Sequence, residues 1–126
     1  MRNKYFAAID MGTNSFHLII VEVMPDGAFK IVDREREVIR LGLNKGEDLS
    51  FIDEDEINRA IKILSGFKKL ADHYKAEFKT VATSAVREAK NREEFLLRVN
   101  RDTGIKIDVI DGSSEASLIY LGVQKA

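Results

Sequence analysis

Residues Ala7 to Val21, which read AAIDMGTNSFHLIIV, decide the fold of this chain. The apolar segments 5–9 and 16–23 flank a polar insert, 10–15, which contains a glycine and several residue types that tolerate turns. Valine, isoleucine and phenylalanine favour strands because branched and aromatic side chains fit a pleated, half-buried surface. The stretch therefore predicts a β-hairpin in the middle of a sheet, with a polar loop at its tip.

The polar insert has the composition of a phosphate-binding loop. Gly12 allows the backbone to approach a ligand closely, and consecutive N–H groups in a turn form a concavity that attracts anions. The carboxylate of Asp10, at the end of a buried strand, is expected to face the same space, which suggests a phosphate held together with a metal ion. A plain hairpin turn explains the same pattern, so the insert alone leaves both interpretations open.

After the hairpin, strand and helix patterns alternate along the chain. Further strands are predicted at 29–41, 78–83 and 105–110, and helices at 53–75, at 91–104 and from 111 onward. The element order βββαβαβα predicts an α/β domain with a mixed five-stranded sheet flanked by helices. Because helices that follow strands imply parallel pairings made by right-handed crossovers, the ends of the first, fourth and fifth strands should share one edge of the sheet.

The first two predicted helices carry start and stop signals. Asp53 with Glu56 three positions later predicts a capping box at the start of the first helix. Asn91 is expected to cap the second helix, and Gly104 is expected to end it, because glycine readily adopts the left-handed conformation that follows many helices.

The strand predicted at 29–41 is apolar at its ends and alternately charged in its middle, as an edge strand would be. Arg34 and Arg36 in that middle are therefore interpreted as part of a solvated face. His17, on the second strand of the hairpin, is interpreted as a packed histidine.

Besides the hairpin loop, the loops at 83–87 and 111–115 are expected at the shared edge of the sheet. Ligands in open α/β sheets bind beyond the carboxyl ends of the strands. The three loops supply the carboxylate of Asp10, the guanidinium of Arg87 and the carboxylate of Glu115. Such groups can hydrolyse a phosphoanhydride, a reaction in which positioning and charge neutralisation do most of the catalysis. A surface arginine and a first-turn carboxylate favoured by the helix dipole explain the last two residues equally well.

The amino-acid composition argues against several classes of function. The chain has 126 residues, of which 33% are charged and 44% are hydrophobic, as is typical of one soluble globular domain. Its formal net charge of -1 argues against a general binder of nucleic acids or anionic membranes. The absence of cysteine excludes disulfides, thiolate catalysis and cysteine-bound zinc. The longest apolar run is far shorter than the ~20 residues that cross a bilayer, so a cytoplasmic protein is expected.

Four segments carry a close resemblance to a known family. They read AAIDMGTNSFHLIIVEV, VIRLG, VATSAVREA and IDGSSEASLIYLGV. Together they resemble the N-terminal domain of the exopolyphosphatase and guanosine pentaphosphate phosphohydrolase (Ppx/GppA) family. This family belongs to the actin-like, sugar-kinase-like ATPase superfamily, so the resemblance implies a ribonuclease-H-like half-domain. It covers nearly the whole chain.

The resemblance also implies roles for individual residues. Magnesium is the implied cofactor, and inorganic polyphosphate or guanosine pentaphosphate is the implied substrate. In the family's usual Gly-x-Glu-Glu-Ala pattern, Ser114 replaces the first glutamate, so the base is kept but the local charge differs. The implied roles are metal binding by Asp10, phosphate binding by Gly12, Thr13, Asn14 and Ser15, and catalysis by Arg87 and Glu115.

Members of the family continue into a second lobe with another phosphate loop. That loop has the form Asp-x-Gly-Gly-Gly-Ser, which does not occur in this sequence. Residues 1–126 are therefore expected to be the N-terminal lobe of a larger phosphohydrolase and to be inactive when isolated. The apolar cleft wall left uncovered without the second lobe would permit a homodimer.

Three alternatives stay open at this point. A ribonuclease-H-like nuclease shares the order of strands and helices, but it needs several carboxylates around two metal ions. A kinase of the same superfamily would bind adenosine in the complete protein. A free-standing domain would bind polyphosphate or guanosine tetraphosphate as a sensor, without turnover.

Overall fold

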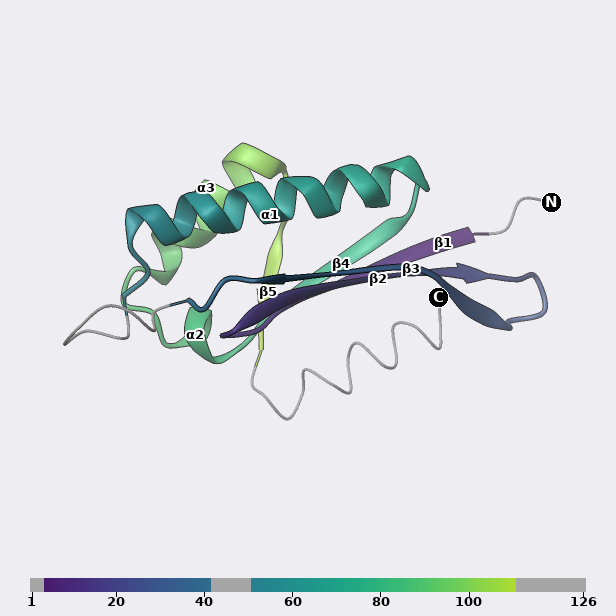
Figure 1. The fold of residues 1–126 in the computed structure, drawn as a ribbon, viewed down its shortest axis with the longest axis horizontal. Coiled ribbons are helices and arrows are strands. Elements are labelled where there is room, and N and C mark those ends of the chain that lie inside the picture. The colour runs from purple at the N-terminus through teal and green to yellow at the C-terminus, as the bar shows by residue number, and fades with distance from the viewer. Residues whose placement is uncertain (1–3, 42–50, 111–126) are drawn as a thin grey trace.

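The computed structural model describes residues 4–41 and 51–110, which form five strands and three helices (Figure 1). In chain order these are β1 (Lys4–Met11), β2 (Ser15–Val23), β3 (Phe29–Val38), α1 (Glu54–His73), β4 (Glu77–Ala82), α2 (Ser84–Arg87), α3 (Arg92–Thr103) and β5 (Ile107–Val109). The order agrees with the predicted pattern, except that the loop expected at 83–87 contains the one-turn helix α2. The helix predicted from 111 onward lies outside the described residues.

The five strands form one mixed sheet in the order β3-β2-β1-β4-β5. β3, β2 and β1 are antiparallel neighbours, whereas β1, β4 and β5 run parallel. Met11 at the end of β1 is paired with Ala82 at the end of β4, and Ala82 is paired with Val109 at the end of β5. The prediction that these three strand ends share one edge is therefore confirmed.

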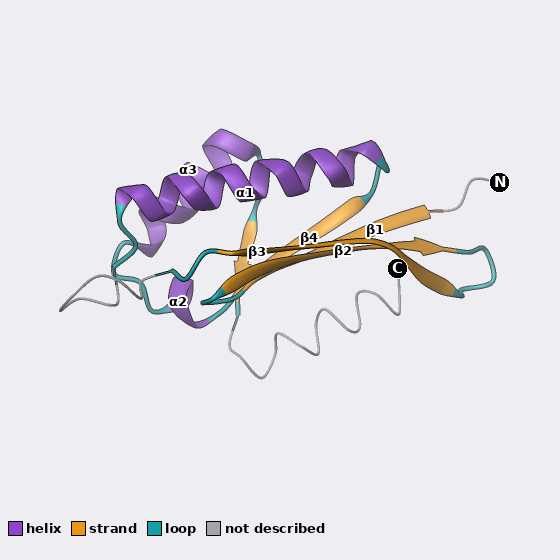
Figure 2. Ribbon diagram, in the orientation of Figure 1, coloured by secondary structure: helices purple, strands orange, loops and turns teal. Residues whose placement is uncertain are grey.

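The helices α1 and α3 cover one face of the sheet (Figure 2). Phe16 and Leu18 of β2 are fully buried and belong to the hydrophobic core on that face. Since side chains alternate along a strand, His17 and Ile19 lie on the opposite face. Asp10 of β1 is the cross-strand partner of His17 and therefore shares that opposite face.

The start of α1 has the predicted capping box. The Asp53 side chain accepts a hydrogen bond from the N–H of Glu56 at 2.8 Å, and the Glu56 carboxylate accepts one from the N–H of Asp53 at 3.0 Å. The Glu56 side chain is consequently hydrogen-bonded although the residue is fully buried. α1 ends at His73, close to the predicted end at Lys75.

Asn91 does not cap α3 with its side chain, contrary to the prediction. Its side-chain amide instead pairs with the backbone of Ile52, which precedes α1. This contact joins the start of α3 to the approach of α1. The predicted end of α3 is confirmed, because Gly104 follows the helix with a φ of 76° and donates its N–H to the Asn100 carbonyl at 2.8 Å.

β3 ends before Leu41, the predicted end of this strand, because the next residues bind the hairpin loop. Ile39 and Arg40 donate their N–H groups to the Asn14 carbonyl at 2.9 and 3.1 Å. Leu41 donates its N–H to the Thr13 carbonyl at 2.8 Å. Arg40 adopts a φ of 57°, which takes the chain out of strand geometry. The segment after β3 thus supports the hairpin loop.

Candidate functional site

The hairpin loop between β1 and β2 is a tight turn. The Gly12 N–H donates to the Ser15 carbonyl oxygen at 3.1 Å. A Cβ atom at position 12 would lie 3.1 Å from the same oxygen, which is tighter than ordinary van der Waals contact. Glycine at this position therefore permits a close approach between two parts of the loop itself.

The segment after β3 determines how the loop peptides are oriented. The carbonyl groups of Thr13 and Asn14 point toward residues 39–41, whose N–H groups they accept. All peptide bonds in the described residues are trans, and in a trans peptide the C=O and N–H groups point in opposite directions. The N–H groups of Asn14 and Ser15 therefore point away from residues 39–41, an orientation compatible with an anion at the tip of the loop.

Asp10, near the end of β1, lies on the sheet face opposite the core. Its carboxylate oxygen Oδ1 is buried and has no hydrogen-bond partner among the described residues. The residue lines a cavity of about 210 Å³ together with Ala8, His17 and Ile19. A buried carboxylate oxygen is costly unless a cation or a donor reaches it, so this atom is a candidate ligand for a metal ion.

A single carboxylate of this kind fits magnesium. Mg²⁺ keeps several waters and is usually held by one or two carboxylates together with substrate phosphates. Residues 4–41 and 51–110 contain no cluster of three or more histidine, cysteine, aspartate or glutamate side chains that would hold a metal ion. The described part of the site therefore suits an ion bound largely through water and phosphate.

His17 faces Asp10 across the two strands of the hairpin. It is exposed, and its Nε2 atom lies 3.0 Å from the Ser15 hydroxyl oxygen, within hydrogen-bond distance. The interpretation of His17 as a packed histidine is wrong, because Phe16 and Leu18 take the core positions of the alternating strand. The imidazole ring instead contacts the hairpin loop through Ser15.

Arg87 is the last residue of α2, and its N–H donates to the Thr83 carbonyl at 2.8 Å. Its guanidinium Nη1 donates to the Ile110 carbonyl, just beyond β5, at 3.0 Å, and Nη2 lies 3.8 Å from the Glu88 carboxylate. The side chain is 34% exposed. An arginine has five N–H donors, so this anchored guanidinium keeps donors for a ligand.

The structure brings Asp10 and Arg87 to the same edge of the sheet but not into one cavity. The chain after β4 lies beside the end of β1, where the Thr83 N–H is 3.4 Å from the Met11 carbonyl oxygen. Arg87 lines a separate cavity of about 690 Å³ beside β4 and β5. Glu115, the predicted catalytic base, lies outside the described residues, so its place in the site stays a prediction.

Arg92 is a further residue of this edge, and no sequence pattern indicated it. Its Nη1 donates to the Arg87 carbonyl at 3.0 Å, and it lines the same cavity as Arg87. The contact crosses the turn between α2 and α3, where the spacing rules for helices and strands do not apply. Arg92 thereby holds the backbone from which the Arg87 side chain projects.

Comparison with known proteins identifies the family of the chain. It matches the Ppx/GppA phosphatase family over residues 19–126. The chain belongs to this family. A guanosine-5'-triphosphate,3'-diphosphate pyrophosphatase of Vibrio cholerae is 37% identical to it, over 94% of this chain and 24% of that protein.

Solved structures agree with this assignment. A Ppx/GppA family member from Aquifex aeolicus has a TM-score of 0.85 and 38% sequence identity, covering 96% of this chain and 39% of that one. An exopolyphosphatase from Cytophaga hutchinsonii has a TM-score of 0.83 and 34% identity, covering 98% of this chain and 39% of that one. The mixed five-stranded sheet and its helices thus form the predicted ribonuclease-H-like half-domain.

The Ppx/GppA chain spans only part of the length of its relatives. It covers 18% of a bifunctional 3-dehydroquinate synthase/phosphatase of Fusobacterium nucleatum and 24% of the Vibrio cholerae pyrophosphatase. In residues 4–41 and 51–110, none of the helices is both long and apolar enough to cross a membrane.

Proposed function

We propose that this Ppx/GppA chain is the N-terminal lobe of a phosphohydrolase that removes the terminal phosphate from inorganic polyphosphate, guanosine pentaphosphate or both. Family membership supports phosphatase chemistry, and the names of two relatives supply the two substrate classes. The observation that carries the proposal is the buried Oδ1 of Asp10, which lacks a partner among the described residues and lies beside the glycine turn. A second lobe would supply the other phosphate loop.

In this proposal the end of β1 and the hairpin loop bind the terminal phosphate. Asp10 would hold magnesium directly or through water, and bound magnesium would neutralise charge on the phosphate oxygens. The N–H groups and hydroxyls of residues 12–15 hold the phosphate itself. His17, at 3.0 Å from the Ser15 Oγ, keeps that hydroxyl in place for the phosphate.

Arg87 and Glu115 act on the rest of the reacting group. Arg87 offsets negative charge on the phosphate chain, and its bond to the Ile110 carbonyl keeps the guanidinium at the shared edge. Glu115 takes a proton from the attacking water, whose oxygen bonds to the terminal phosphorus as the bridging P–O bond breaks. The shortened phosphate chain leaves with the electron pair of that bond.

Release of orthophosphate tests the proposal. Long-chain polyphosphate and guanosine pentaphosphate are incubated, with and without magnesium, with the complete two-lobed protein and with residues 1–126 alone. Two matched variants of the complete protein are compared. Asp10→Asn removes the candidate metal ligand, and Asp26→Asn removes a carboxylate of the β2–β3 turn but retains the oxygen that accepts the Ala28 N–H.

We expect magnesium-dependent release by the complete protein and none by residues 1–126. Asp10→Asn should abolish release, and Asp26→Asn should leave it unchanged. Equal activity of Asp10→Asn and the wild type would remove Asp10 from the metal site. Binding of polyphosphate by the complete protein without any turnover would identify a sensor and reject the hydrolase.

A further inference from the structure

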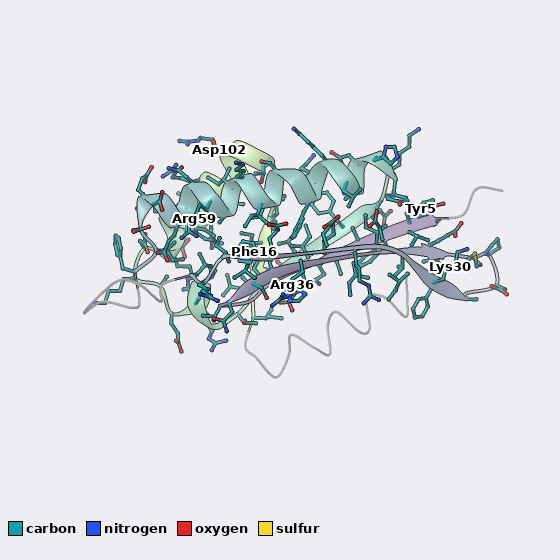
Figure 3. The ribbon with its side chains drawn as sticks, viewed as in Figure 1. Tyr5, Phe16, Lys30, Arg36, Arg59 and Asp102 are labelled. Atoms are coloured by element: carbon teal, nitrogen blue, oxygen red, sulfur yellow. The ribbon has the colours of Figure 1, made fainter. Side chains whose placement is uncertain are left out.

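A row of three side chains crosses the sheet from the candidate phosphate site to the edge strand. Asp10 on β1 is the cross-strand partner of His17 on β2, and His17 is the partner of Arg36 on β3. Residues directly opposite each other in neighbouring strands project from the same face. The three side chains therefore follow one another on the face away from α1, where Figure 3 shows Arg36.

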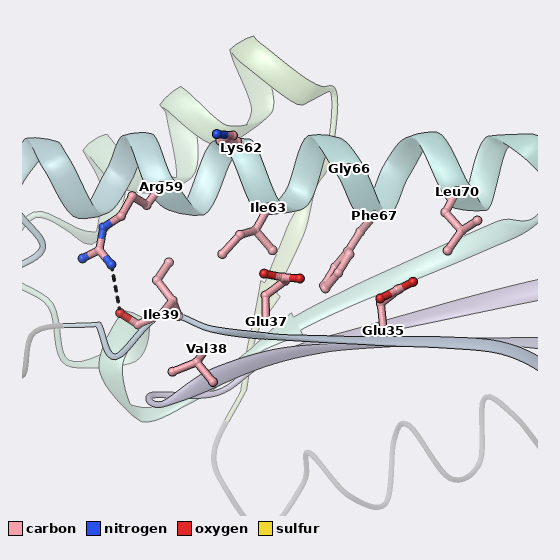
Figure 4. A pocket seen from close by; sticks show the side chains of 10 residues that line it. All are labelled: Glu35, Glu37, Val38, Ile39, Arg59, Lys62, Ile63, Gly66, Phe67 and Leu70. Atoms are coloured by element: carbon pink, nitrogen blue, oxygen red, sulfur yellow. Dashed lines mark hydrogen bonds between the residues drawn. The ribbon is translucent and has the colours of Figure 1, made fainter.

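The acidic and basic side chains in the middle of β3 project from opposite faces of the sheet. Glu35 and Glu37 project toward α1 (Figure 4), whereas Arg34 and Arg36 alternate with them and project from the opposite face. Both arginines are exposed, as predicted. Neither guanidinium is paired with a carboxylate in the part of the chain that the structure describes. The surface beside Asp10 is consequently basic, although the whole chain has a net charge of -1.

A cavity of about 420 Å³ lies at the β3 end of the row. It is lined by His17, Leu18, Ile19, Arg34, Glu35 and Arg36. His17 and Ile19 also line the smaller cavity that contains Asp10. The two cavities therefore share a wall on β2, and together they extend from the Asp10 carboxylate to the Arg36 guanidinium.

We propose that His17 and Arg36 form a second anion subsite, which binds a phosphate of the substrate chain beyond the one held by the hairpin loop. The subsite rests on the proposed function, because it extends the site formed by Asp10 and the loop. Arg36 offers a planar fork of N–H donors that matches two oxygens of one phosphate. The ligand class is a linear chain of phosphates joined by anhydride bonds.

The spacing of the row limits which ligands reach both ends. Neighbouring strands lie about 4.8 Å apart, so the Cα atoms of Asp10 and Arg36, two strands apart, are separated by ~10 Å. A ligand that contacts both Asp10 and Arg36 has to span most of this distance, which a chain of several phosphates does better than a single orthophosphate. His17 lies between them, and its Nε2 contact with Ser15 leaves the other ring nitrogen for a phosphate oxygen. The subsite should therefore favour longer phosphate chains.

Binding and turnover of inorganic tripolyphosphate by the complete two-lobed protein test the subsite. Arg36→Gln removes the charge, and Arg36→Lys keeps the charge but not the fork. Lys69→Gln, on the exposed side of α1, is the matched control. Calorimetry without magnesium should show binding about tenfold weaker in Arg36→Gln, less weakened in Arg36→Lys and unchanged in Lys69→Gln. His17→Ala should weaken binding several-fold.

The kinetic result should separate binding from catalysis. With magnesium present, the KM of Arg36→Gln for tripolyphosphate should rise about tenfold while kcat stays within about twofold, because this contact is made equally in the ground and transition states. A parallel titration with guanosine pentaphosphate distinguishes the source of the phosphate chain. If Arg36→Gln binds both ligands more weakly, the subsite accepts any such phosphate chain. If it binds only tripolyphosphate more weakly, the subsite is specific for the inorganic chain.

Unchanged affinity and KM in Arg36→Gln would overturn the subsite, as would a wild-type protein that does not bind tripolyphosphate. Failure of the hydrolase proposal looks different. In that case the wild type binds tripolyphosphate, Arg36→Gln weakens the binding, and no orthophosphate is released by either protein.

Discussion

The side chain of Asn91 pairs with both backbone polar groups of Ile52. Its Oδ1 accepts the Ile52 N–H at 3.0 Å, and its Nδ2 donates to the Ile52 carbonyl at 2.6 Å. Ile52 is almost fully buried, so water does not readily replace this partner. The contact fixes the start of α1 against the start of α3, and these two helices cover one face of the sheet that carries the hairpin loop.

Asn91→Ala should lower the free energy of unfolding by about 2–3 kcal/mol, because it leaves buried donor and acceptor groups of Ile52 unpaired. Asn91→Asp keeps the acceptor but places a carboxylate oxygen against the Ile52 carbonyl oxygen, so it should destabilise the protein as well. Urea denaturation measures both changes. Lys69→Ala, at an exposed position of α1, is the control and should stay within about 0.5 kcal/mol of the wild type. An equal loss for both alanine variants would contradict a special role for Asn91.

Thr80→Val should stabilise the protein by about 1 kcal/mol. Thr80 is 1% exposed in the middle of β4, and its hydroxyl has no hydrogen-bond partner among the described residues. Valine has nearly the same shape and carries no polar atom to desolvate. Thr103→Val is the opposite case, because the Thr103 hydroxyl donates to the Val99 carbonyl at 2.7 Å and accepts the Ile105 N–H at 3.1 Å. Thermal unfolding should therefore move in opposite directions for the two variants.

The phenols of Tyr5 and Tyr74 should ionise at a higher pH than those of unfolded tyrosines. Their ring centroids are 5.3 Å apart, and their hydroxyls donate to Glu22 and Asp33. Burial and then the charge of Glu22 raise the pKa of Tyr5, and burial and then the charge of Asp33 raise the pKa of Tyr74. Because the folded pKa values exceed the unfolded value of about 10, the stability linked to these phenols is complete below that pH and is lost as the pH rises through the folded pKa values.

An ultraviolet absorbance titration of tyrosinate measures this difference. The native protein should ionise these two phenols at higher pH than the protein in urea, and Tyr5→Phe should remove one of the late transitions. Identical titration curves in the native and unfolded states would show that the contacts with Glu22 and Asp33 do not persist in solution.

β3 should not join two copies of the chain. It is one of the two edge strands of the described sheet, and in an antiparallel pairing of two β3 strands the opposed residues share a face. When the charged middles overlap, Glu35 and Glu37 oppose glutamates, and the arginines beside them oppose arginines. Like charges directly opposite each other are destabilising, so sedimentation at low salt should detect no association through this edge. Replacing both glutamates by threonine should promote it, and hydrogen exchange that protects wild-type β3 in a dimer would contradict the argument.

Local patterns were sufficient to predict most of the fold. The antiparallel hairpin of β1 and β2 follows from two apolar runs around a polar insert, and the Asp53–Glu56 box depends only on residues three positions apart. Asn91 shows where such reasoning stops. Its residue type favours a helix cap, but a backbone partner 39 positions away binds its side chain instead.

Only those features of the candidate site that follow from the order of the strands could be predicted from the sequence. Strand order brings the ends of β1 and β4 together, which places Asp10 and Arg87 at one edge. The position of the end of a long side chain depends on packing. The hydrogen bond from the Arg87 guanidinium to the Ile110 carbonyl could therefore not be predicted. Arg36 has charged neighbours in the chain and was interpreted as solvated. Only the register with His17 shows that it lies in a row with Asp10.

Glu115→Gln in the complete protein should lower kcat by about 10²–10⁴-fold, the usual contribution of a general base. Glutamine has nearly the same size but does not take up the proton of the attacking water. The KM for polyphosphate should change little, because the residue acts on water and not on the phosphate chain. Steady-state kinetics with magnesium measures both parameters.

The competing explanation is that Glu115 is only a first-turn carboxylate that interacts with the helix dipole. Glu94 provides the matched control, since it is an exposed glutamate in the first turn of α3. Glu94→Gln should cost ~0.3–1 kcal/mol of stability at most and leave kcat unchanged. If Glu115→Gln behaved in the same way, with a small loss of stability and normal turnover, Glu115 would have no part in catalysis and the base would have to come from another residue.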